Sequence, residues 1–152
     1  MSYTVSMRIL IVVISFFLVG CFPALKTPGE LAARYKCDPW MISGWEGGAI
    51  EYRSQDNYDN AATVMQRRWG DCKGYAMVAY ETLSFCGLDA HIVILEKEEG
   101  PRHAITTFTF PDGRRGFINA GQSGIYPLGT SWDLIFSDVD FGKWAGASVE
   151  EL

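Results

Sequence analysis

Residues that bind metals or nucleic acids are scarce in this sequence. Its 152 residues include only two histidines and four cysteines, and neither a C-x-x-C nor an H-x-x-x-H spacing occurs, so the usual zinc-ligand patterns are missing. No basic run is longer than a pair such as Arg67-Arg68, and the net charge is −5. The sequence therefore has no cluster of positive charge of the kind that binds the phosphate backbone of a nucleic acid. We expect no metal, no cofactor and no nucleic-acid partner.

Regular hydrophobic periodicity is also missing between residues 40 and 60. Gly, Asp, Asn, Tyr and Trp are frequent there, which predicts an irregular loop region. Asp56, Asp59 and Asn60 carry side-chain oxygens of the kind that bind calcium. Their spacing, however, lacks the alternating ligands and the central glycine of an EF-hand loop. A calcium site is therefore not expected.

The longest hydrophobic run lies at the N-terminus and is short for a bilayer span. Arg8 precedes residues 9–19, which are apolar except for Ser15 and match the length of a signal-peptide core. We expect a secretory signal peptide, with translation starting at Met1 or at Met7.

The end of this run resembles a bacterial lipobox. Cleavage within residues 18–21 (Leu-Val-Gly-Cys) would free the Cys21 amine for acylation and leave its thiol for a diacylglycerol. We therefore expect a signal peptide over residues 1–20, a lipidated cysteine and tether over 21–28, and one domain over 29–152.

The hydrophobic content of 48% is enough for one core. The lipid would hold this domain to a bacterial membrane of the cell envelope, at the outer membrane or cell surface. An uncleaved anchor, or an ordinary signal peptide with a chance cysteine, is the alternative.

One cysteine lies where a polar loop meets the best predicted helix. Cys72 stands within residues 69–76 (Trp-Gly-Asp-Cys-Lys-Gly-Tyr-Ala), and a helix N-terminus stabilises a thiolate through its unpaired N–H groups and positive dipole end. Asp71 suits the N-cap, although its negative charge opposes the thiolate. Helical spacing over residues 72–86, with a following glycine as stop, aligns four residues on one face: Tyr75, Ala79, Leu83 and Cys86.

Two polar residues stand at the ends of predicted strands. Strand-like runs cover residues 90–95, 103–110 and 116–119, so that His103 opens the second and Asn119 closes the third. A three-residue turn at 111–113, with its glycine left-handed, makes Asn119 the diagonal neighbour of His103 on one face of the sheet. Cys72, His103 and Asn119 then supply a nucleophile, a base and an orienting group.

These residues resemble the transglutaminase-like cysteine peptidase superfamily over about residues 61–122. The resemblance rests on Gly70-Asp71-Cys72 entering a helix, on His103-Ala104 beginning a strand, and on a polar residue ending the next strand. It implies a papain-like α+β fold, in which the helix carrying the nucleophile packs on an antiparallel sheet. The family usually has aspartate at the third position, where this chain has Asn119, as papain-type peptidases do.

Other residues compete for parts of this site. Asp112 is an alternative third member, although Pro-Asp-Gly is a turn signature. His91 is an alternative base, yet its apolar strand favours a structural histidine. The Cys72 backbone N–H is one oxyanion donor, and Gln66 is a candidate for the second. Trp69 either lines the site or packs.

The remaining cysteines matter because an exported protein meets an oxidising compartment, in which cysteines tend to pair. An exported chain would place Cys37, Cys72 and Cys86 in an oxidising environment, where an odd count leaves one thiol unpaired. If Cys72 is the nucleophile, Cys37–Cys86 is the only pairing left, and the alternative is that Cys86 is a buried small hydrophobe.

We interpret the chain as an exported, lipid-anchored thiol enzyme that acts on amide bonds of a protein or peptide. Hydrolysis by a cysteine peptidase is favoured over transglutaminase-type acyl transfer. Two readings from other classes stay open, a small structural lipoprotein and a catalytically silent lipoprotein that binds peptide or glycan in a groove lined by four tryptophans: Trp40, Trp45, Trp132 and Trp144.

The lipobox gives a direct test. Cys21→Ser should block lipid attachment, because the acceptor thiol is lost, and should leave precursor or soluble protein. Detergent partitioning and intact mass measure this outcome. Unchanged partitioning of the variant, with no acyl mass on the wild-type protein, would rule the anchor out.

Overall fold

The computed structural model describes residues 24–96, 100–139 and 146–150. The expected signal peptide, Cys21 and Trp144 lie outside the described residues. Within the described part of the chain, no helix is long and apolar enough to cross a membrane.

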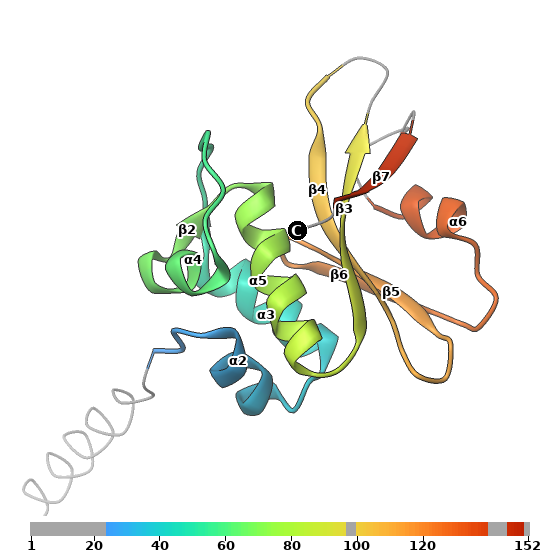
Figure 1. Ribbon diagram of the computed structural model, residues 1–152, viewed down its shortest axis with the longest axis horizontal. Coiled ribbons are helices and arrows are strands. Elements are labelled where there is room, and N and C mark those ends of the chain that lie inside the picture. The colour runs from blue at the N-terminus through green and yellow to red at the C-terminus, as the bar shows by residue number, and fades with distance from the viewer. Residues whose placement is uncertain (1–23, 97–99, 140–145, 151–152) are drawn as a thin grey trace, which may run out of the picture.

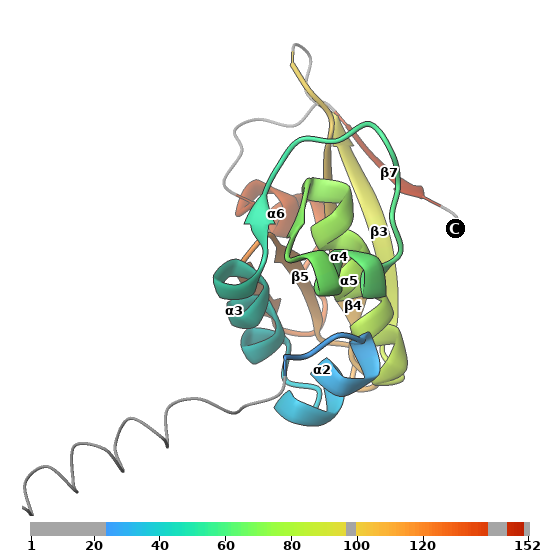
Figure 2. The ribbon, with the colours of Figure 1, turned by 90° about the vertical axis from the view of Figure 1, so that its left-hand side faces the viewer.

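A five-stranded antiparallel sheet, in the order β6-β5-β4-β3-β7, forms the centre of the molecule (Figure 1). The helix α5 packs on its inner strands, with α2, α3 and α4 around it, and α6 covers the opposite face (Figure 2). This helix-on-sheet arrangement confirms the predicted α+β class. The strands are β3 (Asp89–Glu96), β4 (His103–Thr109), β5 (Arg115–Asn119), β6 (Gln122–Tyr126) and β7 (Gly146–Glu150), with a separate parallel pair β1 (Glu51–Tyr52) and β2 (Trp69–Gly70). The helices are α2 (Pro28–Tyr35), α3 (Pro39–Ala49), α4 (Ala61–Arg67), α5 (Cys72–Phe85) and α6 (Trp132–Ser137).

The helix α5 forms as its sequence predicts. The Asp71 carboxylate accepts a hydrogen bond from the Gly74 backbone N–H at 3.0 Å, which caps the helix start. The predicted apolar face is buried at Tyr75, Ala79 and Leu83. Gly87 follows the helix with a φ of +74°, a conformation that glycine adopts without strain.

The β4–β5 hairpin has the predicted register. Thr106 pairs with Ile118 and Thr109 with Arg115, while the Phe110 backbone N–H donates to the Arg114 carbonyl at 2.8 Å. Gly113 takes a φ of +84° in the three-residue turn. The side-chain faces of β4 and β5 are therefore those that the sequence indicates.

The prediction of an irregular loop over residues 40–60 was wrong for its first half. Pro39–Ala49 is the helix α3, because the Asp38 carboxylate accepts from the Trp40 backbone N–H at 2.9 Å and Pro39 occupies the first turn. Three glycines in α3 hide the helical pattern. The helix α4 had no periodicity strong enough to predict either, and it is held by burial of Val64 and Met65 against α5.

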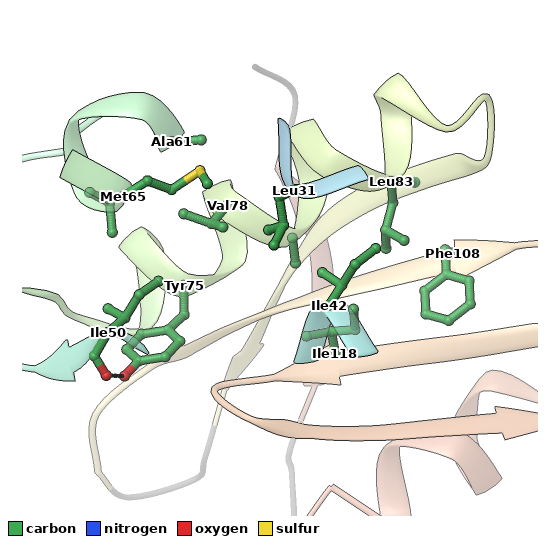
Figure 3. Packing of buried hydrophobic residues seen from close by; sticks show 13 residues of the cluster. Leu31, Ile42, Ile50, Ala61, Met65, Tyr75, Val78, Leu83, Phe108 and Ile118 are labelled. Atoms are coloured by element: carbon green, nitrogen blue, oxygen red, sulfur yellow. Dashed lines mark hydrogen bonds between the residues drawn. The ribbon is translucent and has the colours of Figure 1, made fainter. Parts of the chain in front are cut away.

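The main core lies between α5 and the sheet (Figure 3). It joins residues of α2, α3 and α5 to the facing strands, with fully buried Leu31, Ile42, Leu83 and Phe108 among them. A second cluster on the other face of the sheet packs Ile135 of α6 against Ile105 and its neighbours. Packing on both faces explains why β4 is buried along nearly its whole length, including its polar residues His103, Thr106 and Thr107.

A disulfide joins Cys37, just after α2, to Cys86 at the end of α5. This is the pairing left open by the sequence. Cys72 is the free cysteine among the described residues.

One acid is buried in the core without a hydrogen bond. The Glu46 side chain of α3 has no exposed surface, and neither of its carboxyl oxygens has a hydrogen-bond partner among the described residues. Burial raises the pKa of Glu46 well above its usual range. An ionised Glu46 therefore costs stability at neutral pH.

Replacing this acid should stabilise the fold in a pH-dependent way. Because the folded-state pKa is raised, the cost of Glu46 is present above the ordinary pKa of a carboxyl group and fades as the pH falls below it. Glu46→Met should raise the free energy of unfolding by roughly 1–3 kcal/mol at neutral pH and by less in acid. Denaturant unfolding at several pH values measures the difference. A Glu46→Met variant that is less stable than the wild-type protein at neutral pH would show that the carboxylate is satisfied in the fold.

Candidate functional site

Cys72 is the first residue of α5, directly after its capping residue. The Asp71 side chain is nearly buried, and its second carboxyl oxygen lies 3.5 Å from the Lys73 ammonium. Part of the charge that would oppose a thiolate is therefore balanced by a neighbouring cation. Cys72 itself is half-buried and is not part of a disulfide.

Packing brings Cys72 to the start of β4. The residue lies against a small cluster of Ala76, Ile92 and Ala104, and Ala104 directly follows His103 in the chain. The Thr106 hydroxyl donates to the Ala76 carbonyl at 2.7 Å, which fixes the first turn of α5 along β4. The thiol residue and the imidazole residue therefore stand at the same end of the sheet.

His103 and Asn119 are joined by a hydrogen bond. The His103 Nε2 atom lies 2.7 Å from the Asn119 Oδ1 atom, and both side chains are buried. Since an amide oxygen only accepts, Nε2 carries the proton and Nδ1 is the basic nitrogen of the neutral ring. The Asn119 amide nitrogen donates to the Gln122 Oε1 atom at 3.2 Å, which orients the amide group.

The β5–β6 turn sets the position of Asn119. Ala120 and Gly121 both have positive φ values, +43° and +93°, in the tight turn between Asn119 and Gln122. This turn rests on α3, where a Cβ added at Gly47 would lie 3.0 Å from the Gly121 Cα atom. A side chain at Gly47 would thus push the turn and its asparagine.

The competing residues lie elsewhere. Asp112 accepts from the Arg114 backbone N–H at 3.1 Å, and this bond lowers the pKa of Asp112 within its turn. His91 is half exposed and lies 3.0 Å from Asp89, so it is a surface residue rather than the interior one that its strand suggested. Gln66 is exposed on α4, and its oxyanion role stays a prediction. Trp69 packs under the Arg67 guanidinium, 3.7 Å from its ring centroid.

Two residues beside the site were missed by sequence reasoning. Gln122 follows a two-residue turn whose Gly121 was a usable signal. Tyr52 reaches the start of α5 through the parallel pairing of β1 with β2, in which it stands opposite Gly70, and no local pattern announces such a pairing. Desolvation, and after it the nearby charges of Cys72 and Asp71, raise the pKa of Tyr52.

The tryptophans of the described ranges do not share one groove. Trp40 borders a surface hollow of about 450 Å³ beside β6, together with Phe117 and Gln122. Trp132 borders another of about 340 Å³, next to α6. Trp45 packs 5.1 Å from the Arg68 guanidinium. Within the same part of the chain, no group of three or more His, Cys, Asp or Glu side chains could hold a metal ion.

Comparison with known proteins gives a likeness of fold. No family model matches the chain, and no curated protein matches it. LapG of Legionella pneumophila aligns at 16% identity with a TM-score of 0.48, over 60% of this chain and 56% of that one. A calcium-bound LapG of the same organism aligns at 14% identity and 0.47, over 68% and 79%. A candidate cysteine protease of Cytophaga hutchinsonii aligns at 17% identity and 0.47, over 80% and 44%. The chain thus spans little more than half of the first LapG chain, and a likeness of this degree assigns no role to any residue.

Proposed function

We propose that the chain is an exported cysteine peptidase that hydrolyses an amide bond of a protein or peptide, with Cys72, His103 and Asn119 as its catalytic residues. The observation that carries the proposal is the buried hydrogen bond between His103 and Asn119, at the end of the sheet where α5 presents a free cysteine. A buried imidazole held by an amide, beside a half-buried thiol at a helix start, is the set of groups that thiol-dependent acyl transfer needs.

In the proposed reaction, His103 Nδ1 takes the proton of the Cys72 thiol, and the thiolate attacks the substrate carbonyl carbon. The carbon–sulfur bond forms while the carbonyl π electrons move to the oxygen. Their return breaks the carbon–nitrogen bond, and the imidazolium gives its proton to the leaving amine. Water, deprotonated by His103, then attacks the thioester, and the acid product leaves as the thiol is restored.

Asn119 would act on His103 rather than on the substrate. By accepting from Nε2–H, its Oδ1 atom selects the tautomer in which Nδ1 can take a proton. Because it is neutral, it adds no charge stabilisation to the imidazolium. A thiolate–imidazolium pair tolerates that loss, since the thiolate itself supplies a counter-charge.

Export and lipid anchoring are part of the same proposal. The Cys37–Cys86 disulfide supports an oxidising compartment, where such bonds persist. Together with the lipobox at residues 18–21, it favours an enzyme held to the outer membrane or to the cell surface of a bacterium.

An activated thiol should be detectable without knowledge of the substrate. Iodoacetamide should alkylate Cys72 of the full-length chain rapidly at a pH where an ordinary thiol is mostly protonated, and His103→Ala should slow this reaction by removing the base. Peptide mass mapping measures the rate, with Cys72→Ala as the blank. His91→Ala is the matched control, because His91 lies on the surface, bonded to Asp89. Equal alkylation of wild-type and His103→Ala proteins would overturn the proposed catalytic pair.

Asn119 can be tested through the pH–rate profile. Asn119→Ala should lower kcat/KM by less than loss of Cys72 does, because the ion pair still forms in a fraction of conformers. Asn119→Asp should keep much of the activity and move the basic limb to higher pH, since an added carboxylate favours the imidazolium. Hydrolysis of p-nitrophenyl acetate across pH gives the profiles. Three superimposable curves would remove Asn119 from the site.

A further inference from the structure

The surface hollow beside β6 begins at the groups proposed for catalysis. Gln122, whose side chain accepts from the Asn119 amide at 3.2 Å, is part of the wall of this hollow, and so is Gly121 of the preceding turn. The hollow of about 450 Å³ therefore starts directly behind the bonded pair of His103 and Asn119. In the proposed reaction His103 gives its proton to the leaving amine, so this amine lies on the His103 side of Cys72, where the hollow opens.

The strand β6 has an open edge along the hollow. In the described part of the chain it is the outermost strand of the sheet and pairs with β5 alone. The two-residue turn before β6 makes Asn119 and Gln122 a hydrogen-bonded pair, and such pairs alternate along an antiparallel ladder. The backbone N–H and C=O groups of Ser123 and Ile125 therefore point away from β5. Among the described residues, no backbone group on that outer side bonds to them.

Residues from both faces of the sheet line the hollow, so it follows the edge of β6. Trp40 and Ser43 come from α3 on one face, whereas Asp138 follows α6 on the other. A Cβ added at Gly124 of β6 would lie 2.8 Å from the ring of Phe117. The missing side chain of this glycine therefore lets the Phe117 ring reach the wall of the hollow.

One polar atom in this wall has no partner. Ser43 is only 1% exposed, and its Oγ atom has no hydrogen-bond partner among the described residues. A buried hydroxyl without a partner costs free energy, which a polar group of a ligand in the hollow would recover. Trp40, by contrast, is 55% exposed at the border of the hollow. Its ring offers an aromatic surface to an apolar side chain.

The charge of the wall limits which side chains fit. Asp138 lines the hollow, and the described lining includes no lysine or arginine. The Tyr126 hydroxyl donates to the Asp138 Oδ2 atom at 2.9 Å, which holds the carboxylate in place. The hollow therefore suits neutral or basic side chains and disfavours acidic ones.

We propose that the hollow and the open edge of β6 bind, as an extended strand, the segment of the substrate that follows the scissile amide bond. This inference rests on the proposed function of Cys72. The leaving amine lies beside His103, and the residues after it run away from the site in the direction of β6. Their backbone groups pair with those of Ser123 and Ile125, and their apolar side chains enter the hollow. The substrate class is thus a protein with an extended, apolar segment free of acidic residues after the cleaved bond.

The test uses acetyl transfer, which by microscopic reversibility fills the leaving-amine site in the reverse direction. p-Nitrophenyl acetate acetylates Cys72 of the full-length chain without a peptide segment, and the p-nitrophenolate burst counts the acetylated molecules. A peptide amine then attacks the thioester carbonyl. The carbon–nitrogen bond forms, the carbon–sulfur bond breaks, and the amine proton passes to His103, which restores the thiolate–imidazolium pair. Mass spectrometry of the N-acetyl product measures the transfer.

The pentapeptide Ala-Leu-Ala-Leu-Ala amide should accept acetyl at least about tenfold faster than alaninamide at equal concentration, because two backbone hydrogen bonds and apolar contacts add roughly that much to binding. The acidic analogue Ala-Glu-Ala-Glu-Ala amide should show no such preference over alaninamide, because Asp138 repels it.

Filling the hollow should remove the preference for the apolar pentapeptide. Gly44 lines the hollow, and a Cβ added there meets no atom within 4 Å, so the indole of Gly44→Trp occupies the hollow without displacing α3. Gly48→Trp is the matched control and should keep the wild-type preference. Gly48 lies in the same helix, has an equally open Cβ position and does not line the hollow. Trp40→Ala, which removes the aromatic wall from an exposed position, should also lower the preference and decides the question if Gly44→Trp gives no burst.

No pentapeptide preference in the wild-type protein, or one that survives in Gly44→Trp, would overturn the proposal. So would an equal loss of preference in Gly48→Trp, or faster transfer to the acidic pentapeptide than to the apolar one. If the wild-type protein gives no burst, or if the burst persists in Cys72→Ala, the proposed function itself fails. The burst therefore reports on the proposed function, and the ratio of the two amines reports on the hollow.

Discussion

The docking of α5 on β4 is the interaction on which the rest of the site depends. Small side chains at Ala76 and Ala104 let α5 approach the sheet closely. The Thr106 hydroxyl donates a hydrogen bond to the Ala76 carbonyl and so holds the helix on β4. The hydrogen bond is buried, so losing it would leave the Thr106 hydroxyl unsatisfied as well as a looser contact. Because of this contact, the first residue of α5 and the first residue of β4 lie at one end of the sheet.

The position of Asn119 depends on how β4 pairs with β5 and on how β5 pairs with β6, rather than on α5. His103 and Asn119 can meet only if β4 and β5 keep the register set by the turn at residues 111–113, since a slip by one residue would put them on opposite faces. The Asn119 amide is then fixed by Gln122 across the next turn. That turn is pressed against α3 at Gly47, which makes a helix outside the predicted site part of its support.

Much of this arrangement is local and was therefore predictable. The cap at Asp71, the apolar face of α5 and the turn at Gly113 each follow from a few neighbouring residues. The helix α3 was missed because its glycines lower the apparent helical propensity, while its cap at Asp38 and tertiary burial outweigh them. The pairing of Tyr52 with Gly70 joins segments far apart in the chain, and a two-residue strand has no pattern of its own.

Stability and reactivity are placed at opposite ends of α5. The Cys37–Cys86 disulfide fixes the C-terminal end of the helix, which is about 20 Å from Cys72 at 1.5 Å per residue. The disulfide closes the long loop from Cys37 to Cys86, so it strongly restricts the unfolded chain. It does so without contacting the groups at the start of α5. The N-terminal end can then keep a half-buried free thiol, which adds little to the free energy of folding. The same separation explains how the three cysteines of the described residues serve both ends, because the disulfide removes the two with which Cys72 could otherwise pair there.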